Sequence, residues 1–303
     1  MNQMRNMMNT ETGMENEGHQ NKSADRSFVE DGFEIIKNAI RPEIIHKTQQ
    51  LVNRTISELA KDLDINLAHE VDDDRFFNEG MLNLIKHESP FELLIPVWKN
   101  LSFHGMPQEI FLETRVYKFI SDVLGKDICH QDDPALTLNL PGLSSPNQNY
   151  LFKAFHQEVW SGADVNTIQF WTPIFKSKNC GGLVLVPGSH LWGHIPHRNR
   201  EPIELPKGTE EFMPDIEIGD VIIFHSLLLH GSNPIDGDGQ PVLAMPCLLK
   251  NFRLQNQSFE CFKNWRNFSY SDLSKIDRRL GNHYLSPFRL LNVDKPKFDR
   301  SIS

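Results

Sequence analysis

Cysteine is scarce in this sequence of 303 residues, which contains only four. Cys129, Cys180, Cys247 and Cys261 lie far apart and form no C-x-x-C pair. Zinc ribbons need closely spaced cysteines and disulfide-stapled domains need many of them, so the sequence excludes both. We expect reduced thiols, as in a cytoplasmic protein.

Long apolar runs and excess positive charge are also absent. No stretch approaches the ~18–20 apolar residues of a membrane-spanning helix, and the first residues lack the pattern of a signal peptide. Lys and Arg number 31 against 40 Asp and Glu, a net charge of −9. Such a field repels phosphate backbones and anionic lipids. We therefore expect a cytoplasmic protein that binds neither nucleic acid nor membranes.

The sequence divides by composition into a tail and one domain. Residues 1–27 are rich in Asn, Met, Glu and Gly without a hydrophobic period, which predicts a disordered tail. Residues 28–303 are expected to form a single domain, since no internal repeat or linker interrupts them. It comprises a helical region over 28–130, a β-rich core over about 131–250 and a C-terminal region over 251–303.

Helical signals dominate the first of these regions. A short turn and a strand follow Phe28, and Pro42 then begins an amphipathic helix that extends to about residue 63. A second helical region is predicted over about 91–125, with an interruption near Gly105. A further short helix is predicted over 271–281 in the C-terminal region.

The central region changes to a β pattern. Short apolar runs rich in β-branched and aromatic residues alternate with clusters of Gly, Pro, Asn and Asp, which favours a sandwich or barrel. These runs are ALTLNL, NTIQFWTPI, GGLVLVPG, DVIIFHSLLLH and VLAMPCLL.

Three residues of this region have the pattern of a metal site. His156 and Glu158, in FKAFHQEVW, would point to the same face of a strand. His230 ends the run DVIIFHSLLLH and precedes a Gly-Ser-Asn-Pro turn, which would place its ring at a barrel mouth. Two histidines and one carboxylate are the ligand set of non-haem Fe(II) oxygenases. His225, five residues before His230, would lie on the opposite strand face.

An H-x-E triplet by itself arises often by chance, so the surrounding blocks carry the interpretation. Their order resembles the phytanoyl-CoA dioxygenase family of Fe(II)- and 2-oxoglutarate-dependent oxygenases, over roughly residues 28–249. The blocks are FHQEVW, NTIQFWTPIF, NCGGLVLVPGSHLWG and GDVIIFHSLLLHGSNP.

The resemblance implies a fold, a ligand set and an activity. The fold is a double-stranded β-helix preceded and flanked by helices, a mainly β structure of the jelly-roll type. His156, Glu158 and His230 would bind the iron, and residues 187–190 match the family's P-G-S-H turn. The activity implied is that of a dioxygenase that consumes 2-oxoglutarate and hydroxylates a small molecule. His190, His194 and His197, which lie in a loop, are more typical of exposed or substrate-facing residues.

The sequence departs from the family pattern at the co-substrate. The family has an arginine about ten positions after the distal histidine, whereas this sequence has Gln240 and Pro241 there. Ser232 and Thr167 could replace it as hydroxyl donors, Gln240 is a candidate co-substrate contact at the position of the arginine, and Trp171 aligns near the co-substrate.

Several cations could also replace the missing arginine or meet a charged substrate. Lys250 and Arg253 follow the last predicted core strand and could supply the positive charge. Lys153, Arg198 and Arg200 could pair with a negatively charged substrate, although loop cations are usually solvated surface. The sequence does not choose among them.

The second departure is Glu158, where the family usually has Asp. A glutamate is an equally hard oxygen ligand, so iron binding is still expected. The retained carboxylate disfavours a halogenase. In the halogenases of this superfamily, a small residue stands at the position of the carboxylate and leaves a coordination position for chloride. Three alternatives remain open: an iron enzyme that does not use 2-oxoglutarate, a degenerate binding protein, and an interaction module.

Overall fold

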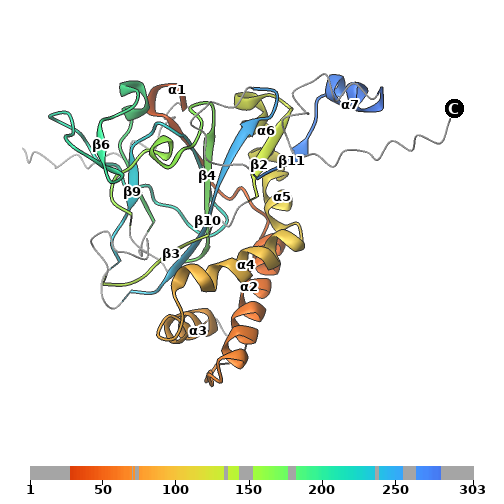
Figure 1. Cartoon of the computed structure of the whole chain (residues 1–303), viewed down its shortest axis with the longest axis vertical. Coiled ribbons are helices and arrows are strands. Elements are labelled where there is room, and N and C mark those ends of the chain that lie inside the picture. The colour runs from red at the N-terminus through yellow and green to blue at the C-terminus, as the bar shows by residue number, and fades with distance from the viewer. Residues whose placement is uncertain are drawn as a thin grey trace, which may run out of the picture.

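A computed structural model describes residues 28–69, 71, 75–132, 136–142, 153–176, 182–235, 239–254 and 264–280. The tail predicted over 1–27 lies outside the described residues, as do Cys180 and Cys261. Figure 1 shows helices α2 to α5 on one side of a large sheet, while strand β9 lies on the other side.

The helices follow the predicted pattern with two differences. Pro42 begins α2 at its first turn, as predicted, and the helix ends at Asp62. The predicted 91–125 region contains three helices, because the chain breaks at Leu112 and Glu113 as well as at Gly105. Helix α3 was not predicted. The helices are α1 (Phe28–Asp31), α2 (Pro42–Asp62), α3 (Phe76–Leu84), α4 (Pro90–Phe103), α5 (Met106–Phe111), α6 (Thr114–Leu124) and α7 (Asp272–Arg279).

Two antiparallel sheets form the centre of the fold. The large sheet has the order β1-β8-β4-β10-β2-β11, with β3 also paired to β10, and β5 pairs with β9 in a small sheet. The strands are β1 (Phe33–Ile36), β2 (Ile128–Gln131), β3 (Thr137–Asn139), β4 (Ile168–Phe175), β5 (Leu183–Leu185), β6 (His197–Arg198), β7 (Glu201–Pro202), β8 (Val221–His225), β9 (His230–Ser232), β10 (Val242–Asn251) and β11 (Trp265–Ser269). The predicted β-helix with flanking helices is confirmed. In the large sheet, β2, which lies at the end of the region predicted to be helical, and the edge strand β11 were not predicted.

The prediction of one strand ending at His230 is wrong. The run DVIIFHSLLLH contains β8 in the large sheet and the start of β9 in the small sheet. A turn separates them, in which the Leu228 N–H donates to the His225 carbonyl at 2.8 Å. Periodicity did not reveal this corner, because both halves of the run and the turn between them are largely buried.

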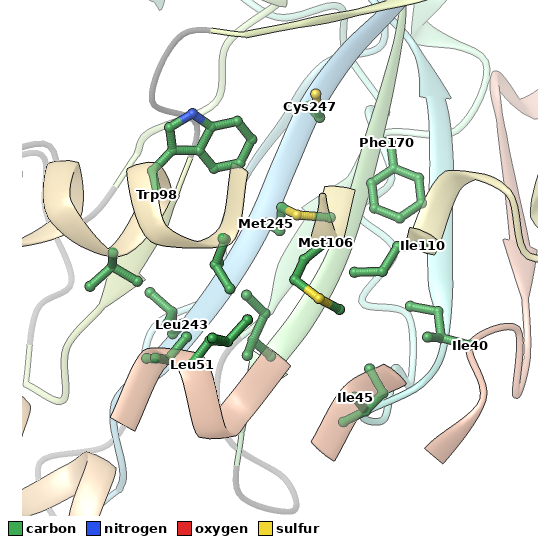
Figure 2. Packing of buried hydrophobic residues seen from close by; sticks show 14 of the residues in the cluster. Ile40, Ile45, Leu51, Trp98, Met106, Ile110, Phe170, Leu243, Met245 and Cys247 are labelled. Atoms are coloured by element: carbon green, nitrogen blue, oxygen red, sulfur yellow. The ribbon is translucent and has the colours of Figure 1, made fainter. Parts of the chain in front are cut away.

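The alternation of side chains along the large sheet gives its two faces different roles. On β4, Ile168, Phe170 and Ile174 belong to a core cluster that the helices cover, and Trp171 belongs to a second cluster on the opposite face. Figure 2 shows the helix-side core, where Phe170 lies near Ile110 of α5, and Trp98 of α4 and Leu51 of α2 belong to the same cluster. The opposite face, toward β5 and β9, is therefore left to form a site.

Two observations bear on the predicted thiols and compartment. Cys129 and Cys247 are buried and free, and burial raises the pKa of the Cys247 thiol, so it is protonated and unreactive. Within the ranges that the structure describes, no helix could cross a membrane. The cytoplasmic location stays a prediction.

His130 gives the fold a pH-dependent stability. It is fully buried on β2, with Nδ1 2.7 Å from the Gln131 carbonyl and Nε2 2.7 Å from the Gln108 amide nitrogen. Burial lowers the pKa of His130 to about 4 in the folded protein. In the unfolded chain the same imidazole is protonated below about pH 6.5.

We expect this histidine to reduce stability as the pH falls from about 6.5 to about 4, by at most about 3 kcal/mol at the acid end. Urea unfolding of the wild type and of His130→Gln at several pH values checks this, because glutamine does not titrate. The slope of unfolding free energy against pH should be shallower in the variant. Equal slopes would contradict the prediction.

Candidate metal centre

Three side chains converge on the inner side of the barrel. His156, Glu158 and His230 each offer a ligand atom, and these atoms all lie within 4.8 Å of one another. The Glu158 Oε1 atom is 3.3 Å from the His230 Nε2 atom and 3.8 Å from the His156 Nε2 atom. All three residues are buried. The structure thus brings together the three residues that the sequence selected.

Backbone pairing between distant segments places the two histidines. His156 and His230 form an isolated antiparallel bridge, with N–H to carbonyl distances of 2.8 and 3.1 Å. Glu158 does not lie on a strand as predicted, because it begins a 3-10 helix, η1 (Glu158–Ser161). Its N–H donates to the Ser226 carbonyl at 3.0 Å, which ties that turn to the corner between β8 and β9.

Hydrogen bonds fix which imidazole nitrogen faces the carboxylate. The Nδ1 atom of His156 lies 2.8 Å from the Ala154 carbonyl, and the Nδ1 atom of His230 lies 3.0 Å from the Leu228 carbonyl. A carbonyl oxygen only accepts, so Nδ1 carries the proton and Nε2 presents a lone pair. Carbonyl partners of this kind orient the histidine ligands of metal sites.

The charge states also suit a cation. Burial, followed by the proximity of His230, lowers the pKa of His156 to about 4, so this ring is neutral near pH 7. Burial alone would raise the pKa of Glu158, but the contacts with His156 and His230 outweigh it and hold that pKa well below its usual range. Without a metal, those contacts require a proton on an imidazole Nε2 atom, because a carboxylate oxygen only accepts. A bound cation would take the place of that proton between the rings and the ionised carboxylate. Nitrogen and oxygen ligands of this kind fit Fe(II).

The Pro-Gly-Ser-His turn supports the strand that carries His230. Ser189 is fully buried and its hydroxyl accepts the Leu229 N–H at 2.8 Å. The Val186 N–H donates to the Leu229 carbonyl at 2.9 Å. Gly188 has φ +74°, which glycine adopts without strain. The residue before His230 is thus held from both of its backbone groups.

Gln157 is a residue of the site that the sequence did not reveal. Its side chain is fully buried between the two ligands of the H-x-E triplet. The amide nitrogen donates to the carbonyls of Gly193 at 2.9 Å and Leu227 at 2.6 Å, and the amide oxygen accepts the Ile195 N–H at 2.9 Å. It therefore joins three segments around the centre. Only its place between two predicted ligands could have signalled this role.

Gly231 allows the two histidine segments to approach each other closely. A Cβ atom on Gly231 would lie 3.2 Å from both the Lys153 carbonyl oxygen and the Phe155 nitrogen, which are backbone atoms. We expect Gly231→Ala to push the segments apart by a few tenths of an ångström and to weaken metal binding about tenfold, as loss of supporting contacts does. Titration of the variant with Mn(II) checks this. An unchanged dissociation constant would show that the backbone absorbs the methyl group.

A cavity of about 40 Å³ adjoins the three residues. Trp171 and Ser232, two of the predicted co-substrate contacts, line it. Thr167 and Gln240 do not, although both are described. The Thr167 hydroxyl instead donates to the Asp164 carbonyl at 2.7 Å, inside the turn before β4. The lining also includes Thr137, Asn139, Lys153, Gln169 and Phe224.

The cations proposed from the end of the last core strand lie elsewhere. The Lys250 ammonium lies 4.0 Å from the centre of the Trp265 ring, and Arg253 pairs with Asp127 at 3.0 Å and with Asp277 at 3.2 Å. Neither lines the cavity.

The loop histidines do not join the convergent group of ligands. His194 is exposed, His197 stacks on Trp160 with ring centroids 4.6 Å apart, and His190 lies near His225.

Comparisons with known proteins agree with this geometry. The chain is similar to the apo structure of the non-heme monooxygenase ThoJ, with a TM-score of 0.54 and 16% identity over 87% of this chain and 94% of ThoJ. A ThoJ–Ni complex gives a TM-score of 0.52 and 14% identity over 86% and 94% of the two chains. Identities this low show a common fold. Residues 28–240 match the phytanoyl-CoA dioxygenase family, and this range is most of the chain. The chain therefore belongs to the phytanoyl-CoA dioxygenase family of Fe(II)- and 2-oxoglutarate-dependent oxygenases.

Proposed function

We propose that this protein binds Fe(II) through His156, Glu158 and His230 and uses 2-oxoglutarate and dioxygen to hydroxylate a small molecule. The observation that carries the proposal is the convergence of two imidazole Nε2 atoms and one carboxylate within 4.8 Å. The nickel complex of the structurally similar ThoJ lends support, since that protein binds a transition metal.

The protein's own groups have separable tasks in this proposal. The three ligands would occupy one face of the metal and leave the other positions to co-substrate and dioxygen. Bound Fe(II) would activate dioxygen, the oxidant that breaks an unactivated C–H bond, while 2-oxoglutarate would supply two electrons and leave as succinate and CO2. Trp171 and Phe224, both nearly fully buried, line the cavity and would help to exclude water during the reaction.

A specific observation favours a second candidate, an iron enzyme that does not use 2-oxoglutarate. The position of the family's arginine is taken by Gln240 and Pro241, and Gln240 does not line the cavity. Neither residue offers the guanidinium fork that binds a carboxylate through two hydrogen bonds.

Anaerobic reconstitution tests the two candidates together. The purified protein is titrated with Fe(II), supplied with 2-oxoglutarate, and exposed to oxygen while succinate is measured. Succinate formed in proportion to protein-bound iron supports the first candidate. Iron binding without any succinate supports the second, and absence of iron binding rejects both. Candidate substrates can then be ranked by how strongly they accelerate 2-oxoglutarate consumption.

A further inference from the structure

We infer that Lys153 binds the distal carboxylate of 2-oxoglutarate, in the role for which the chain has no arginine. The inference rests on the proposed function, since it concerns the co-substrate of that same site. It assigns a specificity-determining role to a residue that the sequence offered only as a loop cation facing a charged substrate.

Charge in the cavity points to Lys153. Among the described residues that line it, Lys153 and Glu158 are the ones with fully charged side chains, and Glu158 belongs to the metal ligands. A dicarboxylate whose 2-oxo acid end reaches the metal still carries one negative charge that needs a partner in a poorly solvated cavity. Within the part of the chain that the structure describes, Lys153 is the cation in position to provide it.

The backbone places Lys153 beside the metal centre. Its N–H donates to the Ser232 hydroxyl at 3.1 Å, and its carbonyl accepts the Ser232 N–H at 2.8 Å. Lys153 also precedes His156 by three residues in the sequence. These hydrogen bonds hold its backbone against β9, the strand that begins with His230.

The neighbouring groups suit a carboxylate. The Ser232 oxygen accepts the Lys153 N–H, so its own proton is available for donation into the cavity. Thr137, Asn139 and Gln169 add further polar side chains to the lining. An ammonium group donates in three directions without a fixed fork, so it would hold the carboxylate less rigidly than an arginine.

Other described cations near the barrel already have partners outside the cavity. Lys176 lies 3.8 Å from Glu217, and its side chain is buried at the end of β4 without lining the cavity. Lys250 and Arg253 lie near the C-terminal end of β10, where Lys250 contacts the Trp265 ring and Arg253 pairs with Asp127, whereas the cavity is lined by the N-terminal half of that strand. The ammonium of Lys153 forms no ion pair with any described residue, so it is available to a ligand.

The test compares two 2-oxo acids on the Mn(II)-loaded protein, where binding is measured without turnover. 2-Oxoglutarate has the distal carboxylate, and 2-oxobutyrate lacks it. By isothermal titration, we expect Lys153→Met to weaken 2-oxoglutarate binding about 10- to 100-fold, the range for a lost charge-assisted hydrogen bond. Binding of 2-oxobutyrate and of Mn(II) should stay within about twofold. Lys153→Arg should retain the preference for 2-oxoglutarate.

Matched variants make the outcomes decisive. Lys118→Met removes an equal charge from an exposed ion pair with Asp122 and should change neither affinity. If Lys153→Met does not fold, Lys153→Gln is compared in the same way. The inference is overturned if the Lys153 variants bind 2-oxoglutarate as the wild type does, or if they lose both acids and the metal equally.

Failure of the proposed function gives a different result. A wild-type protein that binds Mn(II) but neither 2-oxo acid rejects 2-oxoglutarate use, and the assignment of Lys153 fails with it. A wild type that prefers 2-oxoglutarate, combined with an unaffected Lys153→Met, rejects the assignment alone. If Lys153→Met weakens only the binding of an identified substrate, the lysine serves that substrate and the inference is likewise overturned.

Discussion

Replacing His230 with alanine is expected to abolish Fe(II) binding at micromolar metal and to reduce 2-oxoglutarate turnover to background. Supporting contacts alone are worth about 10- to 100-fold in metal affinity, so loss of one of three ligands should cost more. The imidazole is also oriented by the Leu228 carbonyl, which lies 3.0 Å from its Nδ1 atom. Anaerobic Fe(II) titration and succinate measurement check the prediction.

His194→Ala is the matched control for this experiment. His194 is an exposed imidazole in the loop after β5 and does not belong to the convergent ligands. Its removal should leave iron binding and turnover unchanged. The assignment of the centre is wrong if His230→Ala still binds one equivalent of iron with the affinity of the wild type, or if His194→Ala is the variant that loses it.

Replacing Gln157 with leucine is expected to destabilise the apo protein by about 2–4 kcal/mol and to weaken metal binding about tenfold. Leucine has a similar size, but the Ile195 N–H and two carbonyls would lose their partners in a buried site. Each unpaired buried group costs about 1–3 kcal/mol, partly relieved by local rearrangement. Metal affinity falls because Gln157 positions the turn between His156 and Glu158. Urea unfolding of the apo protein and Mn(II) titration measure the two effects.

Gln49→Leu separates the role of Gln157 from the general effect of removing a glutamine. Gln49 is partly buried on α2 and donates a single hydrogen bond, to the Ile174 carbonyl at 2.8 Å. We expect about 1 kcal/mol of destabilisation and no change in metal affinity. If both variants behave alike, Gln157 contributes to general stability only and does not position the ligands.

Much of the candidate site could be predicted because its chemistry is local in sequence. A metal needs few ligand types, and His156, Glu158 and His230 stand in short blocks whose order is specific. The alternation of side chains along a strand can also be predicted from a few neighbouring residues. Trp171 faces the cavity because alternate residues of β4 face opposite sides of the sheet.

Other features depend on contacts that no local pattern encodes. Helix α3 is stabilised by buried aromatic residues that pack against the rest of the helical layer, so its short sequence carries a weak signal. Strand β11 exists because the edge of β2 is available to pair with it. Thr167 has the same strand parity as Gln169, yet the Asp164 turn takes up its hydroxyl.

The sequence by itself therefore determined the family, the β-helix with its helical layer, and the identity of the three convergent residues. Tertiary structure decided how they meet, through the corner that divides β8 from β9 and the 3-10 turn that begins at Glu158. It also decided among the cations. Lys153, Lys250 and Arg253 all carry a positive charge, and the sequence did not distinguish among them. Of the three, Lys153, which is hydrogen-bonded to Ser232, lines the cavity. The reason is physical: ligand type is a property of one side chain, whereas convergence and access depend on the path of the whole chain.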